Sequence, residues 1–245
     1  LYGDLGQVVR ISGGSAGNTV AGVASLTGKA AFIGKVAGDE FGEAYRHDMR
    51  GVGVAFDTSA LKDGAPTASC LVLVTPDGER TMSTFLGACQ ALTPDDVDPA
   101  MVADAEVTFL EGYLWDPEQA KEAFRKAADI AHQNGRKVAL SLSDTFCVDR
   151  FRAEFLDLIK TGTVDIVFAN EHELRALYET ADFDTAVAAL RQDAKLAAVT
   201  MGAEGSLTVT REETHHVRAA SVERIVDLTG AGDLYAGGFL FGLAR

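Results

Sequence analysis

Residues 227–233, which read DLTGAGD, place a carboxylate directly after two glycines and before an apolar run that suits a helix. The N-terminus of a helix has unpaired backbone N–H groups and a partial positive charge, so an anion binds there readily. Asp233 therefore has two candidate roles. It caps the helix, or it acts as a base beside an anion held by the N–H groups of Gly230, Ala231 and Gly232. A cap alone needs no flanking glycines, so the glycines indicate that a ligand approaches the backbone.

A second glycine-dense stretch, SGGSAGN, covers residues 12–18. Gly13 and Gly14 allow the backbone to come close to a ligand. Asn18, about one helical turn further on, offers both a hydrogen-bond donor and an acceptor, which suits the vicinal hydroxyl groups of a sugar. The alternative is a tight turn followed by the close packing of a helix from Asn18 to Leu26. The residues alone leave both interpretations open.

Two more stretches combine the end of a predicted strand with polar side chains. In FANEHE, Asn170 and Glu173 have the spacing of a capping box, which is the favoured interpretation of this pair in isolation. The alternative places them near Mg²⁺ and its water ligands at the carboxyl edge of a sheet. In VTMGAEG, Thr200, Gly202 and Gly205 form either an ordinary turn or a contact with nucleotide phosphates.

The composition limits the classes of partner. The 245 residues carry a formal net charge of −14, which disfavours binding to nucleic acid and to anionic membranes. No apolar run approaches the ~18 residues that span a bilayer. The cysteines, Cys70, Cys89 and Cys147, are odd in number and form no CxxC motif, which argues against a disulfide framework or a zinc site. We therefore expect a cytoplasmic protein that binds a small molecule rather than nucleic acid or membrane.

Apolar periodicity in the second half of the chain alternates between the strand and the helix pattern. It predicts strands over 137–143, 164–170 and 195–202, and helices over 120–131, 151–160, 171–179 and 184–193. Asp116 and Pro117 are expected to be the N-cap and the first-turn residue of the first of these helices. The alternation predicts an α/β fold with a mostly parallel sheet, in which ligands bind at the carboxyl ends of the strands.

The middle of the chain has a different pattern. Two β-rich runs within residues 68–87 surround Pro76-Asp77-Gly78, which is typical of a hairpin. We expect this hairpin to belong to a small β-sheet lid laid over the main sheet, with a further lid strand within residues 1–12. No linker marks a second independent domain, so residues 1–245 are expected to form one domain.

Four of these stretches occur in the order typical of one enzyme family. Residues 12–43 resemble the N-terminal signature of the ribokinase-like (PfkB) carbohydrate and nucleoside kinases, and DLTGAGDLYAGGFL resembles their C-terminal signature. The Asn170/Glu173 pair and the turn at Thr200 lie between the two. Within the family, SGGSAGN, STFLGACQALTPDDV, FLEGYLWDP and SLSDTFCVDRF are most similar to bacterial adenosine kinases.

The resemblance implies a ribokinase-like doubly wound α/β core, with a mostly parallel sheet flanked by helices, and a small β-sheet lid. It implies transfer of the γ-phosphate of ATP to a primary hydroxyl group of an adenosine-like nucleoside, with Mg²⁺ as cofactor. Asp233 matches the general base, and Gly230, Ala231 and Gly232 match the anion hole. A kinase for ribose, fructose or 2-keto-3-deoxygluconate is the alternative within the family, and a non-catalytic nucleotide-binding relative is a third hypothesis.

The residues and the resemblance together predict three groups of binding residues. They are the substrate-binding Gly13, Gly14, Ser15, Asn18 and Tyr113; the nucleotide- and Mg²⁺-binding Asn170, Glu173, Thr200, Gly202 and Gly205; and Asp227 and Thr229, where some members bind a monovalent cation such as K⁺. Tyr113 and Trp115 would stack on a nucleobase, or they are core aromatic residues, and both readings stay open. Arg80 is a candidate for offsetting phosphate charge, against the plain reading of a solubilising hairpin arginine.

The family's first strand, which supplies a substrate-binding Asp, and the segments after the C-terminal signature, which help to hold adenine, have no counterpart in this chain. We therefore expect a chain that is truncated at both ends. Lid edges pair between subunits in some members, so a homodimer through the lid is one expected assembly.

Overall fold

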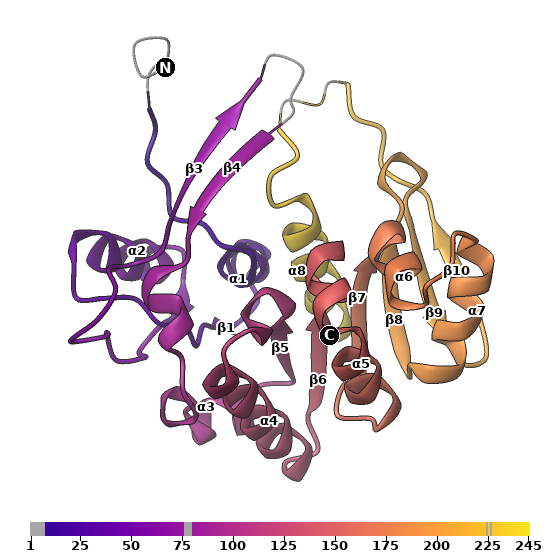
Figure 1. The fold of residues 1–245 in the computed structure, drawn as a ribbon, viewed down its shortest axis with the longest axis horizontal. Coiled ribbons are helices and arrows are strands. Elements are labelled where there is room, and N and C mark those ends of the chain that lie inside the picture. Colours follow the sequence, from indigo (N-terminus) through magenta and orange to yellow (C-terminus); the bar gives the residue numbers. More distant parts are fainter. Residues whose placement is uncertain (1–7, 76–79, 224, 226) are drawn as a thin grey trace.

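A six-stranded sheet forms the centre of the molecule (Figure 1). The computed structural model describes residues 8–75, 80–223, 225 and 227–245. The strands lie in the order β10-β9-β8-β7-β6-β5, with three parallel pairings and two antiparallel ones. The parallel strands are β5 (Val107–Glu111), β6 (Lys137–Ser141), β7 (Ile166–Asn170) and β8 (Leu196–Thr200), and the antiparallel pairings add β9 (Ser206–Thr210) and β10 (Thr214–Val217). The carboxyl ends of β5 to β8 therefore meet at one edge.

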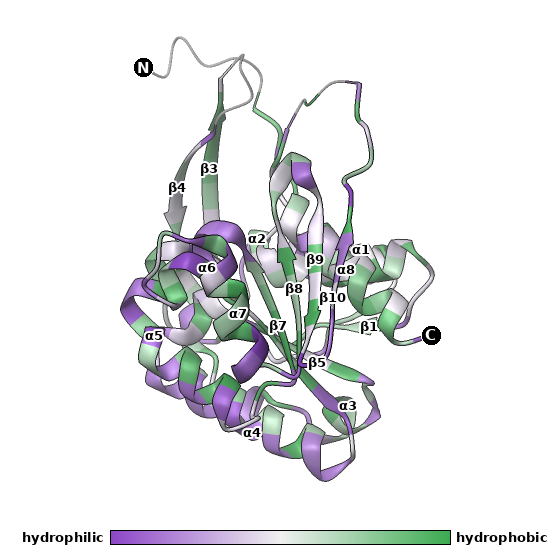
Figure 2. Ribbon diagram, turned by 90° about the vertical axis from the view of Figure 1, so that its right-hand side faces the viewer, coloured by the Kyte–Doolittle hydropathy of each residue, from purple (hydrophilic) through white to green (hydrophobic). Residues whose placement is uncertain are grey.

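Helices cover both faces of this sheet. On one side lie α4 (Glu118–Gln133), α5 (Thr145–Lys160), α6 (Glu171–Leu177) and α7 (Phe183–Asp193); on the other lie α1 (Ser15–Ser25) and α8 (Ala231–Leu243). The side chains of β6 alternate between the two faces of the sheet, so that Val138 and Leu140 pack toward α4 while Ala139 packs toward α8. Both faces are therefore apolar and need a covering layer of helices. In Figure 2 the hydrophobic colour is concentrated on β7 and β8, between the helices. The expected doubly wound, mostly parallel fold is confirmed.

Aspartate N-caps start several of the helices. The carboxylate of Asp144 accepts a hydrogen bond from the N–H of Cys147, so α5 begins at Thr145, six residues before the predicted start. A non-helical conformation at Phe151 interrupts that helix and accounts for the shorter prediction. The N-cap of α4 is Pro117 rather than Asp116, whose carboxylate is instead paired with Arg150.

The N-terminal third of the chain forms two smaller sheets. Strands β1 (Ala30–Ala31) and β2 (Val54–Ala55) pair in parallel beside α2 (Glu40–Gly51), around a separate apolar cluster that includes Met49 and Phe56. Short helices η2 (Gly87–Ala91), η3 (Pro94–Asp96) and α3 (Pro99–Asp104) lead from this region to β5, with η4 (Gly112–Trp115) after β5 and η5 (Gly202–Glu204) after β8.

The predicted hairpin is present as the antiparallel strands β3 (Ser69–Val74) and β4 (Arg80–Phe85). It projects from the body in Figure 1, and every residue of both strands is exposed. The predicted turn at residues 76–78 lies outside the described residues, as do residues 1–7 of the predicted N-terminal lid strand. Residues 8–12 belong to no strand.

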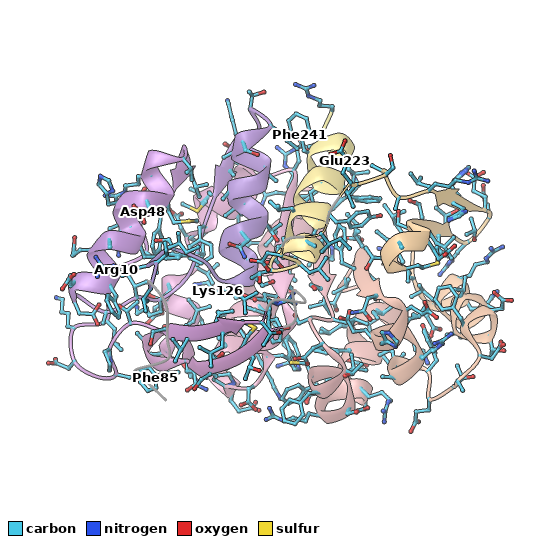
Figure 3. All side chains as sticks on the ribbon, turned by 90° about the horizontal axis from the view of Figure 1, so that it is seen from above. Arg10, Asp48, Phe85, Lys126, Glu223 and Phe241 are labelled. Atoms are coloured by element: carbon cyan, nitrogen blue, oxygen red, sulfur yellow. The ribbon has the colours of Figure 1, made fainter. Side chains whose placement is uncertain are left out.

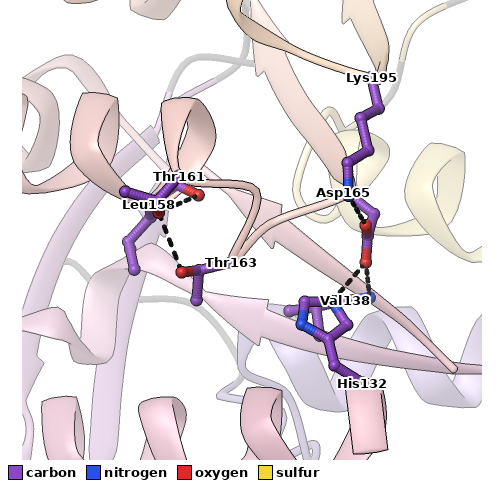
Figure 4. Close-up of polar contacts among 7 residues, drawn as sticks. All are labelled: His132, Val138, Leu158, Thr161, Thr163, Asp165 and Lys195. Atoms are coloured by element: carbon purple, nitrogen blue, oxygen red, sulfur yellow. Dashed lines mark hydrogen bonds and ion pairs between the residues drawn. The ribbon is translucent and has the colours of Figure 1, made fainter. Parts of the chain in front are cut away.

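A polar cluster joins the strands at the edge of the sheet opposite the carboxyl ends (Figure 4). Asp165, just before β7, accepts hydrogen bonds from the N–H of Val138 at 2.9 Å and from Lys195 Nζ at 2.6 Å, and its Oδ2 lies 2.8 Å from His132 Nε2. Although burial alone would raise it, the pKa of Asp165 is lowered by these partners. Asp165 therefore ties β6 and β8 to β7.

Within the described ranges, no helix has the length and apolar character needed to cross a membrane.

Candidate active site

The N-terminus of α8 is built by a glycine in the left-handed conformation. Gly230 has φ 75° and is the N-cap of the helix, a conformation that glycine adopts without strain. The N–H of Ala231 donates to the carbonyl of Leu228 at 3.2 Å. The N–H groups of Gly230, Gly232 and Asp233 have no recorded partner among the described residues, and a Cβ added to Gly232 would meet nothing within 4 Å. Of the three amides expected to hold an anion, those of Gly230 and Gly232 therefore stand open, whereas that of Ala231 is engaged, and the amide of Asp233 is open beside them.

Asp233 lies in the first turn of α8 and contacts the other glycine-rich stretch. Asn18 Nδ2 donates to Asp233 Oδ2 at 2.8 Å, although the two residues are 215 positions apart. Helices α1 and α8 run side by side in Figures 1 and 3. Glycines allow this approach, because a Cβ on Gly237 of α8 would lie 2.7 Å from the carbonyl oxygen of Thr19. The close helix packing suggested for residues 12–26 and the contact with Asp233 are thus one feature.

Gly13, Gly14 and Ser15 lead into α1 beside this contact. Gly14 has φ 96° and is the N-cap of the helix, but it has no side chain with which to cap it. A Cβ on Gly13 would meet only the side-chain oxygen of Asn18, at 4.0 Å. The backbone around Gly13 is therefore open, as its proposed substrate contact requires.

The structure adds a residue that the sequence reasoning missed, Glu111 at the carboxyl end of β5. Ser15 and Ala16 at the start of α1 and Asp233 of α8 lie near enough to influence the pKa of this carboxylate. Burial raises the pKa of Glu111 to about 7, and the neighbouring charge of Asp233 adds to the increase. The sequence held one signal for this residue, because the stretch FLEG places a carboxylate at the end of a strand.

Asn170 and Glu173 form the capping box that their spacing predicts. Asn170 Oδ1 accepts from the N–H of Glu173 at 2.9 Å, and Glu173 Oε2 accepts from the N–H of Asn170 at 3.0 Å. The side chain of Glu173 is buried, which raises its pKa to about 7, and the nearby Asp144 raises it further. Thr200 is the register partner of Asn170 on the neighbouring strand. The capping interpretation is confirmed, and the Mg²⁺ interpretation of the same pair stays a prediction.

The glycines after β8 have different environments. Gly205 has φ 100°, and a Cβ there would lie 2.0 Å from the carbonyl oxygen of Val217, so the close approach is made by the chain itself. Gly202 has φ 57° and is exposed, and a Cβ added there would meet nothing within 4 Å. Of the two glycines, only Gly202 leaves open space for a phosphate group.

Asp227 and Thr229 form a local turn before α8. Asp227 Oδ1 accepts from the N–H of Thr229 at 2.8 Å and from its hydroxyl group at 2.7 Å, and these bonds lower the pKa of Asp227. Arg80 of the hairpin is close enough to lower this pKa further. Arg80 therefore lies within electrostatic reach of Asp227.

The two aromatic candidates behave differently. Trp115 is fully buried, packs against Phe124 and Phe155, and donates from Nε1 to Glu154 at 2.9 Å, so it is a core residue. Tyr113 is 45% exposed, and its hydroxyl group donates to the carbonyl oxygen of Ser143 at 3.1 Å. Its pKa is raised, chiefly by burial of the hydroxyl group, with smaller increases from carboxylates that include Glu173 and Glu111. Only Tyr113 is placed to contact a ligand.

Comparison with known proteins gives concordant matches. The model of a family described as pfkB family carbohydrate kinase matches residues 4–245. The crystal structure of adenosine kinase from Sinorhizobium meliloti has a TM-score of 0.95 and 57% identity, and the alignment covers 99% of this chain and 74% of that one. A "probable sugar kinase protein" from Rhizobium etli CFN 42 has a TM-score of 0.96 and 52% identity, with coverage of 99% and 73%. The fructokinase of Solanum tuberosum is 28% identical over 95% of this chain and 71% of its own length.

Proposed function

Because this chain belongs to the pfkB family of carbohydrate kinases, we propose that it transfers the γ-phosphoryl group of ATP to a primary hydroxyl group of an adenosine-like nucleoside. Family membership makes the chain an ATP-dependent kinase. The relatives that support a nucleoside as acceptor are the 57% identical adenosine kinase of Sinorhizobium meliloti and the 28% identical adenosine kinase of Saccharomyces cerevisiae. The alternative acceptor is a sugar such as ribose, fructose or 2-keto-3-deoxygluconate, which the Rhizobium etli protein and the fructokinases favour.

The observation that carries the proposal is the contact between Asn18 and Asp233 at the open N-terminus of α8. Phosphoryl transfer depends on positioning and on charge stabilisation more than on covalent chemistry. Asp233 accepts the proton of the attacking hydroxyl group, and the N–H groups of Gly230 and Gly232, with that of Asp233 beside them, receive the oxygens of the transferred phosphoryl group. Asn18 fixes the orientation of the Asp233 carboxylate, and Gly13, Gly14, Ser15 and Tyr113 are the proposed acceptor contacts.

The residues at the sheet edge fit ATP and Mg²⁺. Glu173 is a buried carboxylate beside Asp144 with a raised pKa, a donor set that a divalent cation would stabilise in its ionised form. Asn170, Glu173, Thr200 and Gly202 are the proposed contacts of the nucleotide and its Mg²⁺, whereas Gly205 acts through the backbone turn. When bound, Mg²⁺ neutralises phosphate charge. Bound Mg²⁺ and the N-terminus of α8 would favour ATP locally, although the chain carries a net charge of −14.

A substrate panel tests the proposal. Adenosine, ribose, fructose and 2-keto-3-deoxygluconate are each offered with ATP and Mg²⁺, and phosphorylation of adenosine is expected. Asp233→Asn is expected to keep ATP binding and lower turnover about 10²- to 10⁴-fold. Asp182→Asn is the matched control, because Asp182 also stands at a helix N-terminus, where its carboxylate caps α7. Near-normal turnover in Asp233→Asn would refute the assignment of the base.

Two finer elements of the proposal concern K⁺ and assembly. Asp227 and Thr229 are the proposed K⁺ contacts, tested by comparing activity in K⁺ buffer with activity in Na⁺ buffer.

The hairpin β3–β4 exposes Leu71, Val74 and Met82, and an isolated two-stranded hairpin is marginally stable in water. We expect a second copy to cover part of it, so Leu71→Lys should shift a dimer to monomer in sedimentation. A cytoplasmic location is part of the same proposal, consistent with three free cysteine thiols.

A further inference from the structure

Ser143 has a left-handed backbone conformation at the carboxyl edge of the central sheet. Its φ is 74°, and among the described residues the other non-glycine residues with a positive φ are Thr27 and Glu179. Residues other than glycine rarely adopt this conformation, and such residues concentrate at functional sites, where their surroundings hold them in place. Ser143 follows the end of β6 and directly precedes Asp144, the N-cap of α5. Its contacts show what the conformation achieves.

Both polar ends of Tyr113 are bound to this one serine. The N–H of Tyr113 donates to the hydroxyl oxygen of Ser143 at 3.1 Å, and the phenol of Tyr113 donates to the carbonyl oxygen of Ser143, also at 3.1 Å. Ser143 therefore presents its side chain and its carbonyl group to the same neighbour. The tyrosine ring is tethered at its base through the backbone and at its tip through the hydroxyl group.

The surroundings hold both partners in place. The N–H of Ser143 donates to the hydroxyl oxygen of Ser141 at 3.2 Å. The segment after β5 lies directly against the segment after β6, because a Cβ on Gly112 would be 2.5 Å from the carbonyl oxygen of Ser141 and 3.0 Å from Ser143 Oγ. The first N–H groups of a helix have no partner within it, and the N-cap of η4 makes no side-chain hydrogen bond. Ser143 supplies the missing acceptor from the neighbouring strand (Figure 1).

The tethered tyrosine still has surface available to a ligand. Tyr113 is half-exposed although Ser143 engages both of its polar groups. Glu111 and Glu173, at the same edge of the sheet, lie within electrostatic reach of its hydroxyl group. A ring that is already fixed loses no rotamer freedom when a flat ligand stacks on it, so it binds that ligand more tightly than a mobile ring does. A nucleobase is such a ligand, because every base has a flat π-face.

We propose that Ser143 is a positioning residue for the acceptor: by binding the N–H and the phenol of Tyr113 together, it fixes the ring as a preformed surface for a nucleobase. This inference rests on the proposed function, in which Tyr113 contacts a nucleoside. Ser143 itself needs no contact with either substrate. Its left-handed backbone brings both acceptor atoms to the one tyrosine.

Steady-state kinetics of Ser143→Gly with adenosine and ATP test this role. Glycine adopts a φ of 74° without strain and keeps the carbonyl group, but it removes the hydroxyl group that binds the Tyr113 N–H. The KM for adenosine is expected to rise roughly 2- to 10-fold, with kcat and the KM for ATP unchanged, because the ring must then be ordered in the binding step. Thr27→Gly is the matched control, since Thr27 is exposed and has a similar φ of 68°; it should match the wild type.

A double-mutant cycle separates an effect through the ring from direct contact with the acceptor. Tyr113→Ala removes the stacking surface and is expected to raise the KM for adenosine roughly 5- to 100-fold. In the Tyr113→Ala background, Ser143→Gly should have no further effect, because it acts only through the ring. Tyr113→Phe keeps the ring and removes the phenol tether, so its KM for adenosine should rise about as much as that of Ser143→Gly.

Crystal structures of the acceptor-free protein follow the ring itself. The ring of Tyr113 should have one orientation in the wild type and in Thr27→Gly, and more than one in Ser143→Gly. If Ser143→Gly does not fold, Tyr113→Phe carries both the kinetic test and the structural test, because it removes the other tether from the same ring.

Three results would overturn the role of Ser143: an unchanged KM for adenosine in Ser143→Gly, an equal effect of Ser143→Gly in the wild-type and Tyr113→Ala backgrounds, or a single unchanged ring orientation in Ser143→Gly. The second result would make Ser143 an acceptor-binding group. If Asp233→Asn is inactive while the Ser143 and Tyr113 variants match the wild type, only this inference fails. If the wild type does not phosphorylate adenosine, the proposed function fails, and the crystal structures still decide whether Ser143 fixes the ring.

Discussion

The contact between α1 and α8 can be disturbed by a single methyl group, in Gly237→Ala. A Cβ on Gly237 would lie 2.7 Å from the carbonyl oxygen of Thr19 and 3.4 Å from the N of Val23. Ordinary contact starts at 3.4 Å, so the two helices must separate locally by about 0.7 Å. Both neighbours are backbone atoms and cannot rotate away. Because Asn18 and Asp233 lie at one end of this same helix pair, the separation reaches their hydrogen bond.

Two opposing terms set the expected size of the stability change. Overpacking of a tight interface typically destabilises by about 1–3 kcal/mol, while replacing glycine by alanine within a helix gains about 0.5–1 kcal/mol. Gly238→Ala is the matched control, because a Cβ on Gly238 would meet nothing within 4 Å and should show only the gain. The two variants should therefore differ by about 1–3 kcal/mol in the free energy of unfolding.

Urea unfolding and steady-state kinetics measure the two consequences. A misplacement of about 1 Å costs up to roughly 10²-fold in rate, so Gly237→Ala is expected to lower kcat roughly 10- to 100-fold. Gly238→Ala should leave kcat unchanged. If the two variants match each other in stability and in kcat, the glycine does not set the distance between the helices, and the packing explanation of the Asn18–Asp233 contact is refuted.

Three further predictions concern other parts of the fold. Asp165→Asn should destabilise the protein by about 1–3 kcal/mol at pH 7. Because the folded pKa of Asp165 is lowered, its contribution is fully present above the ordinary value of 3.8 and is lost as the pH falls through the folded pKa, so the difference between the two proteins in urea unfolding should shrink as the pH falls below 3.8. Asn170→Ala combined with Glu173→Gln should raise the Mg²⁺ concentration needed for half-maximal activity, and a loss of thermal stability alone would leave only the capping role. Gly205→Ala should lower the melting temperature by several degrees, because its Cβ would meet the carbonyl oxygen of Val217 at 2.0 Å; an unchanged melting temperature would contradict this.

Local patterns predicted the elements well, because their causes lie within a few residues. The strands β6, β7 and β8 and the helices between them follow from apolar periodicity, and the Asn170/Glu173 capping box follows from a spacing of three. Where an observed boundary differs from the predicted one, a local exception is the cause. Helix α5 starts earlier because Asp144 caps it, and the irregular conformation at Phe151 hides its continuity.

The sequence by itself also predicted the form of the N-terminus of the last helix. Two glycines before Asp233 predicted a helix N-terminus open to an anion with a carboxylate beside it, and the structure has that arrangement. The structure also shows that the N–H of Ala231 donates to the carbonyl of Leu228 and is therefore not open to an anion. Similarly, the sequence left the roles of Trp115 and Tyr113 open, and only packing shows that Trp115 is a core residue and that Tyr113 is exposed.

Only the tertiary structure decided which distant groups meet. Asn18 reaches Asp233 across 215 positions because glycines let α1 and α8 approach, and no local pattern encodes that distance. Burial in the folded chain also raises the pKa of Glu111, at the end of β5, to about 7. Burial and the interaction between separated charges depend on the folded arrangement of the whole chain, so the residue types were readable in advance while their partnership was not.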